Sequence, residues 1–138
     1  AAHVLEADPE TLRDAVRALG GADVVYDPVG GALWKAALRA ANFEARLLPV
    51  GFASGEVPQI PANILLVKNL TVIGLYWGAY RKHAPGVIAD SLRRLFDWCA
   101  EGRLRPHVTH RLPLERAEEA LALLRERRAA GKIVLEMG

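Results

Sequence analysis

Short segments rich in β-branched and aromatic residues alternate with segments of helical character along the chain, and this alternation constrains the fold most. The apolar segments are Ala22–Asp27, Arg46–Val50 and Leu70–Trp77, and each is followed by a glycine-containing turn. Between them, Leu33–Ala40 and Ala62–Val67 have the apolar spacing of helices. Strands separated by helices form βαβ units with parallel strands, so the sequence predicts an α/β fold.

The flanking regions contain further elements of the same two kinds. Asp8 and Pro9 are suited to cap and begin a helix that runs to Gly20. An apolar stripe on one helix face, ending before Gly102, predicts that Cys99 lies in the core. The stripe consists of Ile88, Leu92, Leu95, Phe96 and Cys99. Further expected elements are strands at His3–Glu6, Val108–Arg111 and Lys132–Glu136, and a helix at Leu114–Arg128.

The composition argues against several classes of protein. The 138 residues carry a formal net charge of +2, with basic residues scattered among acidic ones, which disfavours a nucleic-acid-binding surface. No apolar run reaches the roughly 20 residues of a membrane span, and the first residues lack a signal-peptide pattern. The single cysteine permits no internal disulfide. These features predict a cytoplasmic protein that binds neither nucleic acid nor membranes.

The turns after the three apolar segments are the candidate binding residues, because ligands of open parallel sheets bind beyond the carboxyl ends of the strands. Glycines in Pro28–Gly31 and Gly51–Gly55 would let a flat ligand approach the backbone closely. Leu75–Gly78 places two large aromatic residues at the third strand end. Together these turns indicate a dinucleotide-binding edge. The alternative is that the glycines only form turns and the aromatic residues cover the core.

The histidines do not indicate a metal site. His107 and His110 would face opposite sides of a short strand, and no cysteine or carboxylate is near enough in sequence to complete a tetrahedral set. No side chain is an obvious general acid or base, so we assign no catalytic residue and no metal ligand.

Four separated segments resemble a known family. Ala22–Gly30, Arg46–Gly55 and Ile60–Tyr80 are similar to the NADPH:quinone oxidoreductase branch, which includes zeta-crystallin, of the medium-chain dehydrogenase/reductase superfamily. His107–Ala120 with Gly131–Leu135 resembles the closing segment of that family, where the chain returns to the catalytic domain. The resemblance follows the family's order over essentially the whole chain.

The resemblance implies a partial Rossmann domain that lacks its first two strands. The family's glycine-rich pyrophosphate-binding turn does not occur in this sequence. His3–Glu6 would be the third Rossmann strand, and the three apolar segments the fourth, fifth and sixth. In the order 3-2-1-4-5-6 a gap then separates His3–Glu6 from Ala22–Asp27. We expect the first strand to be displaced, or the exposed edge to pair with a second copy or a larger protein. Residues 1–102 would belong to the Rossmann domain and 103–138 to the catalytic domain.

The resemblance also implies roles for individual residues. Val29, Gly30 and Gly31 would lie near the adenosine side of the cofactor, and Gly51, Phe52, Ala53 and Ser54 near the ribose and nicotinamide. Leu75, Tyr76 and Trp77 would flank the nicotinamide, with core or inter-domain packing as the alternative for Tyr76 and Trp77. Ala45 occupies a position where the family usually has glycine, so the local turn is expected to differ there.

The implied function is that of a fragment of an NADPH-dependent oxidoreductase acting on quinones or activated carbonyl or enone substrates. The isolated chain should be inactive and bind NADPH weakly. The preference for NADPH over NADH is itself inherited from the resemblance. The family commonly pairs its sixth strand across a dimer, which implies a homodimer through Leu70–Trp77. Two alternatives stay open: a fragment of a zinc-dependent alcohol dehydrogenase, and a non-catalytic dimerisation module.

Overall fold

The computed structural model describes all residues, 1–138, and divides them into two compact units, Ala1–His83 and Ala84–Gly138. This division reflects contacts within the chain alone. The boundary expected at residue 102, between the Rossmann and catalytic domains, stays a prediction. No helix combines the length and the apolar character that crossing a membrane requires.

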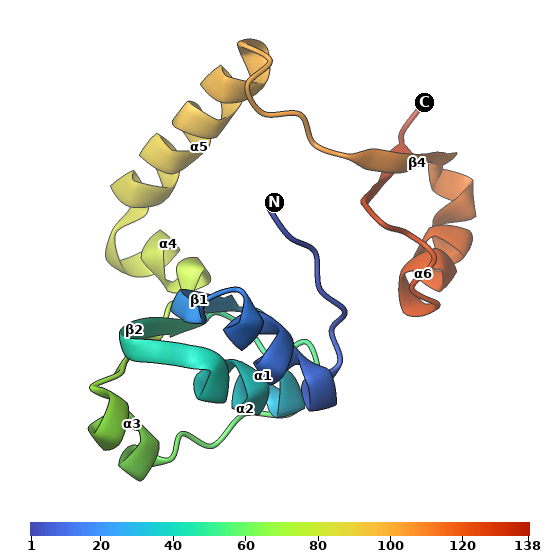
Figure 1. Cartoon of the computed structure of the whole chain (residues 1–138). Coiled ribbons are helices and arrows are strands. Elements are labelled where there is room, and N and C mark those ends of the chain that lie inside the picture. The colour runs from blue at the N-terminus through green and yellow to red at the C-terminus, as the bar shows by residue number, and fades with distance from the viewer. The chain divides into compact units, whose positions relative to one another are not determined.

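The first unit is a three-stranded parallel sheet with helices packed on one of its faces. Its strands are β1 (Ala22–Asp27), β2 (Ala41–Pro49) and β3 (Thr71–Val72), in the spatial order β1-β2-β3. Its helices are α1 (Pro9–Ala18), α2 (Gly31–Ala40), α3 (Ala62–Lys68), the 3-10 turn η1 (Trp77–Ala79) and the short α4 (Tyr80–His83). The predicted α/β fold with parallel strands is confirmed, and Figure 1 shows β1 beside β2.

The core of this unit lies between one face of the sheet and the helices α2 and α3. Its centre is formed by Trp34 and Leu38 of α2 with Leu47 of β2, whose side chains are almost completely buried. Ile64 and Leu65 of α3 pack against the same cluster. The opposite face of the sheet is bare. Because side chains alternate along a strand, this face carries Val24, Tyr26 and Ile73, among others, and they are exposed.

The start of α1 follows the sequence signals closely. Pro9 is its first residue, and the Asp8 carboxylate accepts a hydrogen bond of 3.0 Å from the Glu10 amide. Pro49, which has no amide hydrogen to donate, is the last residue of β2 and so ends the central strand.

Two expected strands differ from the structure. His3–Glu6 forms no strand and lies in an exposed segment, with Val4 91% exposed. His3–Glu6 does not pair with β1, whose outer edge is free, and pairing of that edge with a second copy or a longer protein stays a prediction. The strand expected at Leu70–Trp77 is regular only at Thr71–Val72. The amides of Ile73 and Leu75 still donate to β2, at 2.9 and 3.3 Å, before the chain turns into η1.

The second unit contains a long helix and a small βαβ unit. The helix is α5 (Pro85–Ala100), and the βαβ unit consists of β4 (Val108–Pro113), the 3-10 turn η2 (Leu114–Arg116), α6 (Ala117–Arg125) and β5 (Lys132–Glu136). β4 and β5 are parallel, and Leu112, Ala120 and Leu123 form their core with α6. The helix expected at Leu114–Arg128 is therefore shorter at both ends.

Cys99 is exposed, which contradicts its predicted place in a core. The apolar stripe of α5 is present, but no residue of this helix is buried. A periodic pattern identifies the face that a helix can bury, whereas burial itself requires a surface to pack against.

Candidate functional site

The carboxylate of Asp27 organises the turn that follows β1. One of its oxygens accepts hydrogen bonds from the amides of Val29, at 2.7 Å, and Gly30, at 3.0 Å. Asp27 is only 8% exposed, and these bonds satisfy the buried carboxylate. The sequence analysis did not single out Asp27, although an aspartate two or three residues before glycines is a known signal for such a turn.

The turns after β1 and β2 hold each other through backbone hydrogen bonds. The amides of Ala53 and Ser54 donate to the carbonyl oxygens of Pro28 and Val29, at 3.1 and 3.0 Å. The Ser54 hydroxyl donates to the same Val29 carbonyl at 2.7 Å. Two of the three predicted turns are thus a single interlocked structure at the carboxyl edge of the sheet.

Gly30 and Gly31 are needed for this contact between the turns. Both have positive φ, 74° and 59°. A Cβ atom on Gly30 would lie 2.8 Å from the carbonyl oxygen of Glu56, and one on Gly31 would lie 2.9 Å from the Ser54 hydroxyl. Because neither glycine has a side chain, the loop that contains Ser54 and Glu56 can pack directly against their backbone. The amides of Val29, Gly30 and Gly31 all donate within the chain, so the adenosine-side role of these residues stays a prediction.

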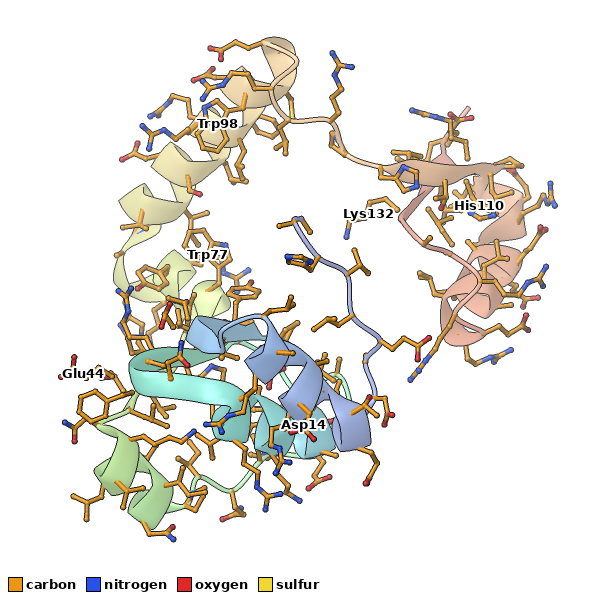
Figure 2. The ribbon with its side chains drawn as sticks, in the orientation of Figure 1. Asp14, Glu44, Trp77, Trp98, His110 and Lys132 are labelled. Carbon is orange, nitrogen blue, oxygen red and sulfur yellow. The ribbon has the colours of Figure 1, made fainter.

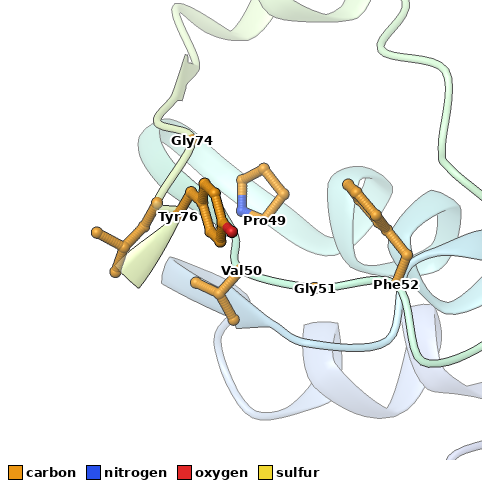
Figure 3. A pocket seen from close by; sticks show the side chains of 7 residues that line it. Pro49, Val50, Gly51, Phe52, Gly74 and Tyr76 are labelled. Atoms are coloured by element: carbon orange, nitrogen blue, oxygen red, sulfur yellow. The ribbon is translucent and has the colours of Figure 1, made fainter. Parts of the chain in front are cut away.

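A cavity of about 370 Å³ opens between the end of β2 and the segment after β3 (Figure 3). Its volume is within the range of small-molecule sites. Four of the predicted cofactor-binding residues line it: Gly51, Phe52, Leu75 and Tyr76. The sequence analysis did not select the other lining residues, Pro49, Val50 and Gly74. No charged side chain belongs to this wall, so the cavity suits an uncharged ring.

The other predicted residues lie outside the cavity wall. Ala53 and Ser54 are held against the turn after β1 by the hydrogen bonds described above. Trp77 begins η1, and its ring lies 5.4 Å from that of Tyr80, centroid to centroid. Figure 3 shows the ring of Tyr76 next to Pro49 and Val50. The structure thus brings the second and third predicted turns together through Phe52 and Tyr76.

The backbone beside the cavity retains unused donors. The amide of Val50 donates to the Asp27 carbonyl at 2.9 Å, and that of Leu75 to the Pro49 carbonyl at 3.3 Å. The amides of Gly51 and Phe52 make no hydrogen bond within the chain. They can donate to a polar edge of a bound ring.

The groups whose pKa values are shifted lie outside the cavity wall. Burial, followed by the positive charge of Arg17, lowers the pKa of Lys68. A hydrogen bond from Arg13 lowers the pKa of Asp14 on the surface of α1. No group of three His, Cys, Asp or Glu side chains converges in the chain, so no metal centre can be assigned to its own residues. The cavity therefore offers shape, an apolar surface and backbone donors.

Parallel strands with a ligand-sized cavity at their carboxyl edge are typical of nucleotide-binding Rossmann domains. The sequence profile of the family described as zinc-binding dehydrogenase matches residues 1–135. The chain belongs to this family, whose members are medium-chain dehydrogenases/reductases, and it matches the C-terminal part of their Rossmann domain.

Two curated relatives are quinone oxidoreductase-like proteins. The quinone oxidoreductase-like protein 2 homolog of Nematostella vectensis is 40% identical over 130 residues, which span 91% of this chain and 36% of the relative. The quinone oxidoreductase-like protein 2 of Bos taurus is also 40% identical, over 92% of this chain and 37% of its own length. The chain thus spans little more than a third of the length of these relatives.

Solved structures agree in fold over nearly the whole chain. A mycobacterial protein solved as a complex with NADPH superposes with a TM-score of 0.77 and 27% identity, over 93% of this chain and 40% of that one. A quinone oxidoreductase of Pseudomonas syringae gives a TM-score of 0.69 and 27% identity, over 94% of this chain and 40% of that one.

Proposed function

We propose that this chain supplies the nicotinamide-side wall of an NADPH-binding cleft in a longer oxidoreductase that reduces quinones or activated carbonyl or enone compounds. The observation that carries the proposal is the uncharged cavity at the carboxyl edge of the sheet, lined by Gly51, Phe52, Leu75 and Tyr76. The names of the curated relatives and the mycobacterial NADPH complex support the choice of substrate and cofactor.

The residues present fit one end of the dinucleotide. The apolar cavity would hold the nicotinamide ring, and the unused amides of Gly51 and Phe52 would hold its carboxamide. The diphosphate needs several backbone donors at a helix start, and the amides of Val29, Gly30 and Gly31 are already used within the chain. We therefore expect the isolated chain to be inactive and to bind NADPH weakly, because the diphosphate-binding wall must come from elsewhere.

When bound, NADPH supplies a hydride that reduces the substrate, with a proton from solvent completing the product. The chain's own contribution is to bind and orient the reactants and to exclude water. Phe52, Leu75 and Tyr76 provide an apolar wall that shields the site, and the rigid turn after β2 fixes the direction of the amide donors. No general acid or base is required of this chain.

The proposal is tested by NADPH-dependent quinone reduction in the full-length protein and its Phe52→Ala variant. Removing the ring takes away one apolar wall of the cavity, so we expect kcat/KM to fall about five- to tenfold. Phe43→Ala is the matched control, because Phe43 is an exposed aromatic residue of β2 that does not line the cavity. Equal kcat/KM values for both variants and the wild type would show that the cavity takes no part in the reaction.

We also propose a homodimer through Leu70–Trp77. β3 is the last strand of the sheet, and only one of its two edges is paired. The amides of Ile73 and Leu75 point to β2, so those of Val72 and Gly74 lie on the free edge. An unpaired strand edge is a ready template for pairing with a second chain.

A further inference from the structure

One wall of the cavity continues directly into a short basic helix. Leu75 and Tyr76, which line the cavity, are followed by η1 and then by α4. The last three residues of α4 are Arg81, Lys82 and His83. All three are exposed, and their side chains make no hydrogen bond or ion pair within the chain.

No acidic residue near this helix in sequence offsets its charge. The stretch from Val57 to Ala89 contains neither Asp nor Glu. The acidic residues of the adjoining turns are already engaged. The Asp27 carboxylate accepts from backbone amides, and Glu56 lies 3.4 Å from the Lys35 ammonium group. A positive field that is not neutralised locally attracts anions to the neighbouring cavity.

The helix is fixed relative to the cavity wall. The Ala79 amide donates to the Tyr76 carbonyl at 3.1 Å, and the rings of Trp77 and Tyr80 lie 5.4 Å apart. Arg81 is five positions after Tyr76, which at helical rise is roughly 8–10 Å along the backbone. The long side chains of Arg81 and Lys82 can span most of this distance while their charged ends stay in water.

We propose that Arg81 and Lys82 bind an anionic group on the substrate, whose uncharged conjugated part lies against the nicotinamide ring at the mouth of the cavity. This inference rests on the proposed function and names a substrate class for the same site: a quinone or enone that carries a negatively charged substituent. The uncharged wall excludes the charged group from the cavity itself, so the charge must lie at the rim. Arg81 and Lys82 are specificity-determining residues in this assignment and take no part in hydride transfer.

We expect Arg81 and Lys82 to affect mainly the binding of the substrate. Exposed charges interact weakly and are screened by salt, but they raise the local concentration of an oppositely charged ligand. We therefore expect KM for an anionic substrate to change more than kcat, and the preference to shrink as salt increases. A preference based on apolar contact would not weaken with salt.

The experiment compares 1,2-naphthoquinone-4-sulfonate with uncharged 1,2-naphthoquinone as substrates of the full-length protein. In Arg81→Ala/Lys82→Ala, KM for the sulfonate should rise about tenfold at low salt, while KM for the uncharged quinone stays within about twofold. Arg81→Lys/Lys82→Arg retains both charges and should retain the preference. Arg17→Ala/Arg39→Ala removes two exposed charges from α1 and α2 and should leave it unchanged.

Equal changes in KM for both quinones, or no change, would overturn the inference without affecting the proposed function. If the wild type reduces neither quinone, the proposed function fails, and calorimetric titration with 2-naphthalenesulfonate and with 2-naphthol then decides the inference. Selective loss of sulfonate binding in Arg81→Ala/Lys82→Ala supports the anion site. Unchanged or absent sulfonate binding refutes it.

Discussion

Glu44 adopts a backbone conformation that suits glycine better than glutamate. Its φ is 61°, and it lies in β2 where the register with β1 shifts between Ala41 and Arg46. Its side chain is exposed (Figure 2), whereas the next residue, Ala45, is 1% exposed. The sequence analysis expected this turn to differ because alanine replaces the family's glycine at position 45. The positive φ of this turn lies at Glu44, the residue before Ala45.

Glu44→Gly should stabilise the chain by about 1 kcal/mol, because a left-handed conformation costs an L-residue about 1–2 kcal/mol and part of that gain is offset by unfolded-chain entropy. The measurement is the free energy of unfolding in urea. Glu44→Ala is the control, since alanine keeps the Cβ atom and should give no comparable gain. Similar stabilisation by both substitutions would mean that backbone strain at this position is not the cause.

Sequence reasoning at the residue scale succeeded where the signal was local. Asp8 and Pro9 begin α1 as predicted, because a cap needs only its own helix. Gly30 and Gly31 were selected correctly as special positions, but the partner of their bare backbone was not foreseen. The loop that fills it comes from Ser54 and Glu56, more than twenty residues away, and no local pattern reveals that contact.

At the scale of elements, Lys68 joins the end of α3 to the end of α2. Its ammonium group donates to the carbonyl oxygens of Arg39, at 2.9 Å, and Ala41, at 2.8 Å. A third carbonyl, that of Leu38, lies at 3.4 Å. The last carbonyls of a helix lack partners in the helix itself, so a single cation here satisfies several of them.

Lys68→Met should destabilise the chain by about 1–3 kcal/mol, because the substitution leaves these carbonyls without their donor. The difference should depend on pH. Burial lowers the pKa of Lys68 below its ordinary 10.5, so the unfolded chain holds this proton more firmly than the folded chain. As pH rises from the lowered pKa towards 10.5, the wild type should therefore gain stability relative to Lys68→Met.

The pH dependence is measured by urea unfolding of both proteins at several pH values. Arg17 is the neighbouring charge that also lowers the pKa of Lys68. Arg17→Ala should therefore bring this pKa closer to its ordinary value and narrow the pH range over which the stability difference changes. A constant difference between wild type and Lys68→Met from neutral pH to pH 10.5 would contradict a lowered pKa.

The helices and strands were predictable in proportion to how local their causes are. α2, α3, α5 and β5 follow from apolar spacing and turn residues, and all were expected close to their observed positions. The strand at His3–Glu6 and the burial of Cys99 were wrong, since both depend on a partner surface that periodicity cannot supply. β3 is shorter than expected because Gly74 and the aromatic residues after it leave the regular strand conformation.

At the scale of the whole molecule, pairing through β3 predicts a concentration-dependent dimer. Gly74→Pro removes an amide from the free edge of β3 while leaving the donors to β2 in place, so it should weaken dimerisation severalfold. Analytical ultracentrifugation measures the dissociation constant. Gly86→Pro, at an exposed position in the first turn of α5, is the control. A wild type that stays monomeric at all concentrations would end the proposal.

The candidate site was predicted in outline from the sequence. Phe52 and Tyr76 lie at the same cavity because parallel strands end at one edge, which is a property of the fold class. Trp77 was expected beside them, but the chain turns into η1 at that residue and directs its ring towards Tyr80. The basic character of α4 was visible in the sequence, and only the position of the cavity gives it a role.

The bare face of the sheet and the unpaired outer edge of β1 have a consequence for biosynthesis. In the longer relatives this stretch corresponds to the C-terminal part of the Rossmann domain, so it leaves the ribosome after the strands that precede it. Val24 and Tyr26 would then meet a partly formed sheet as soon as they emerge. If this stretch is synthesised without the preceding strands, the same residues can contact only solvent, chaperones or other copies of the chain. We therefore expect the isolated polypeptide to be prone to aggregation.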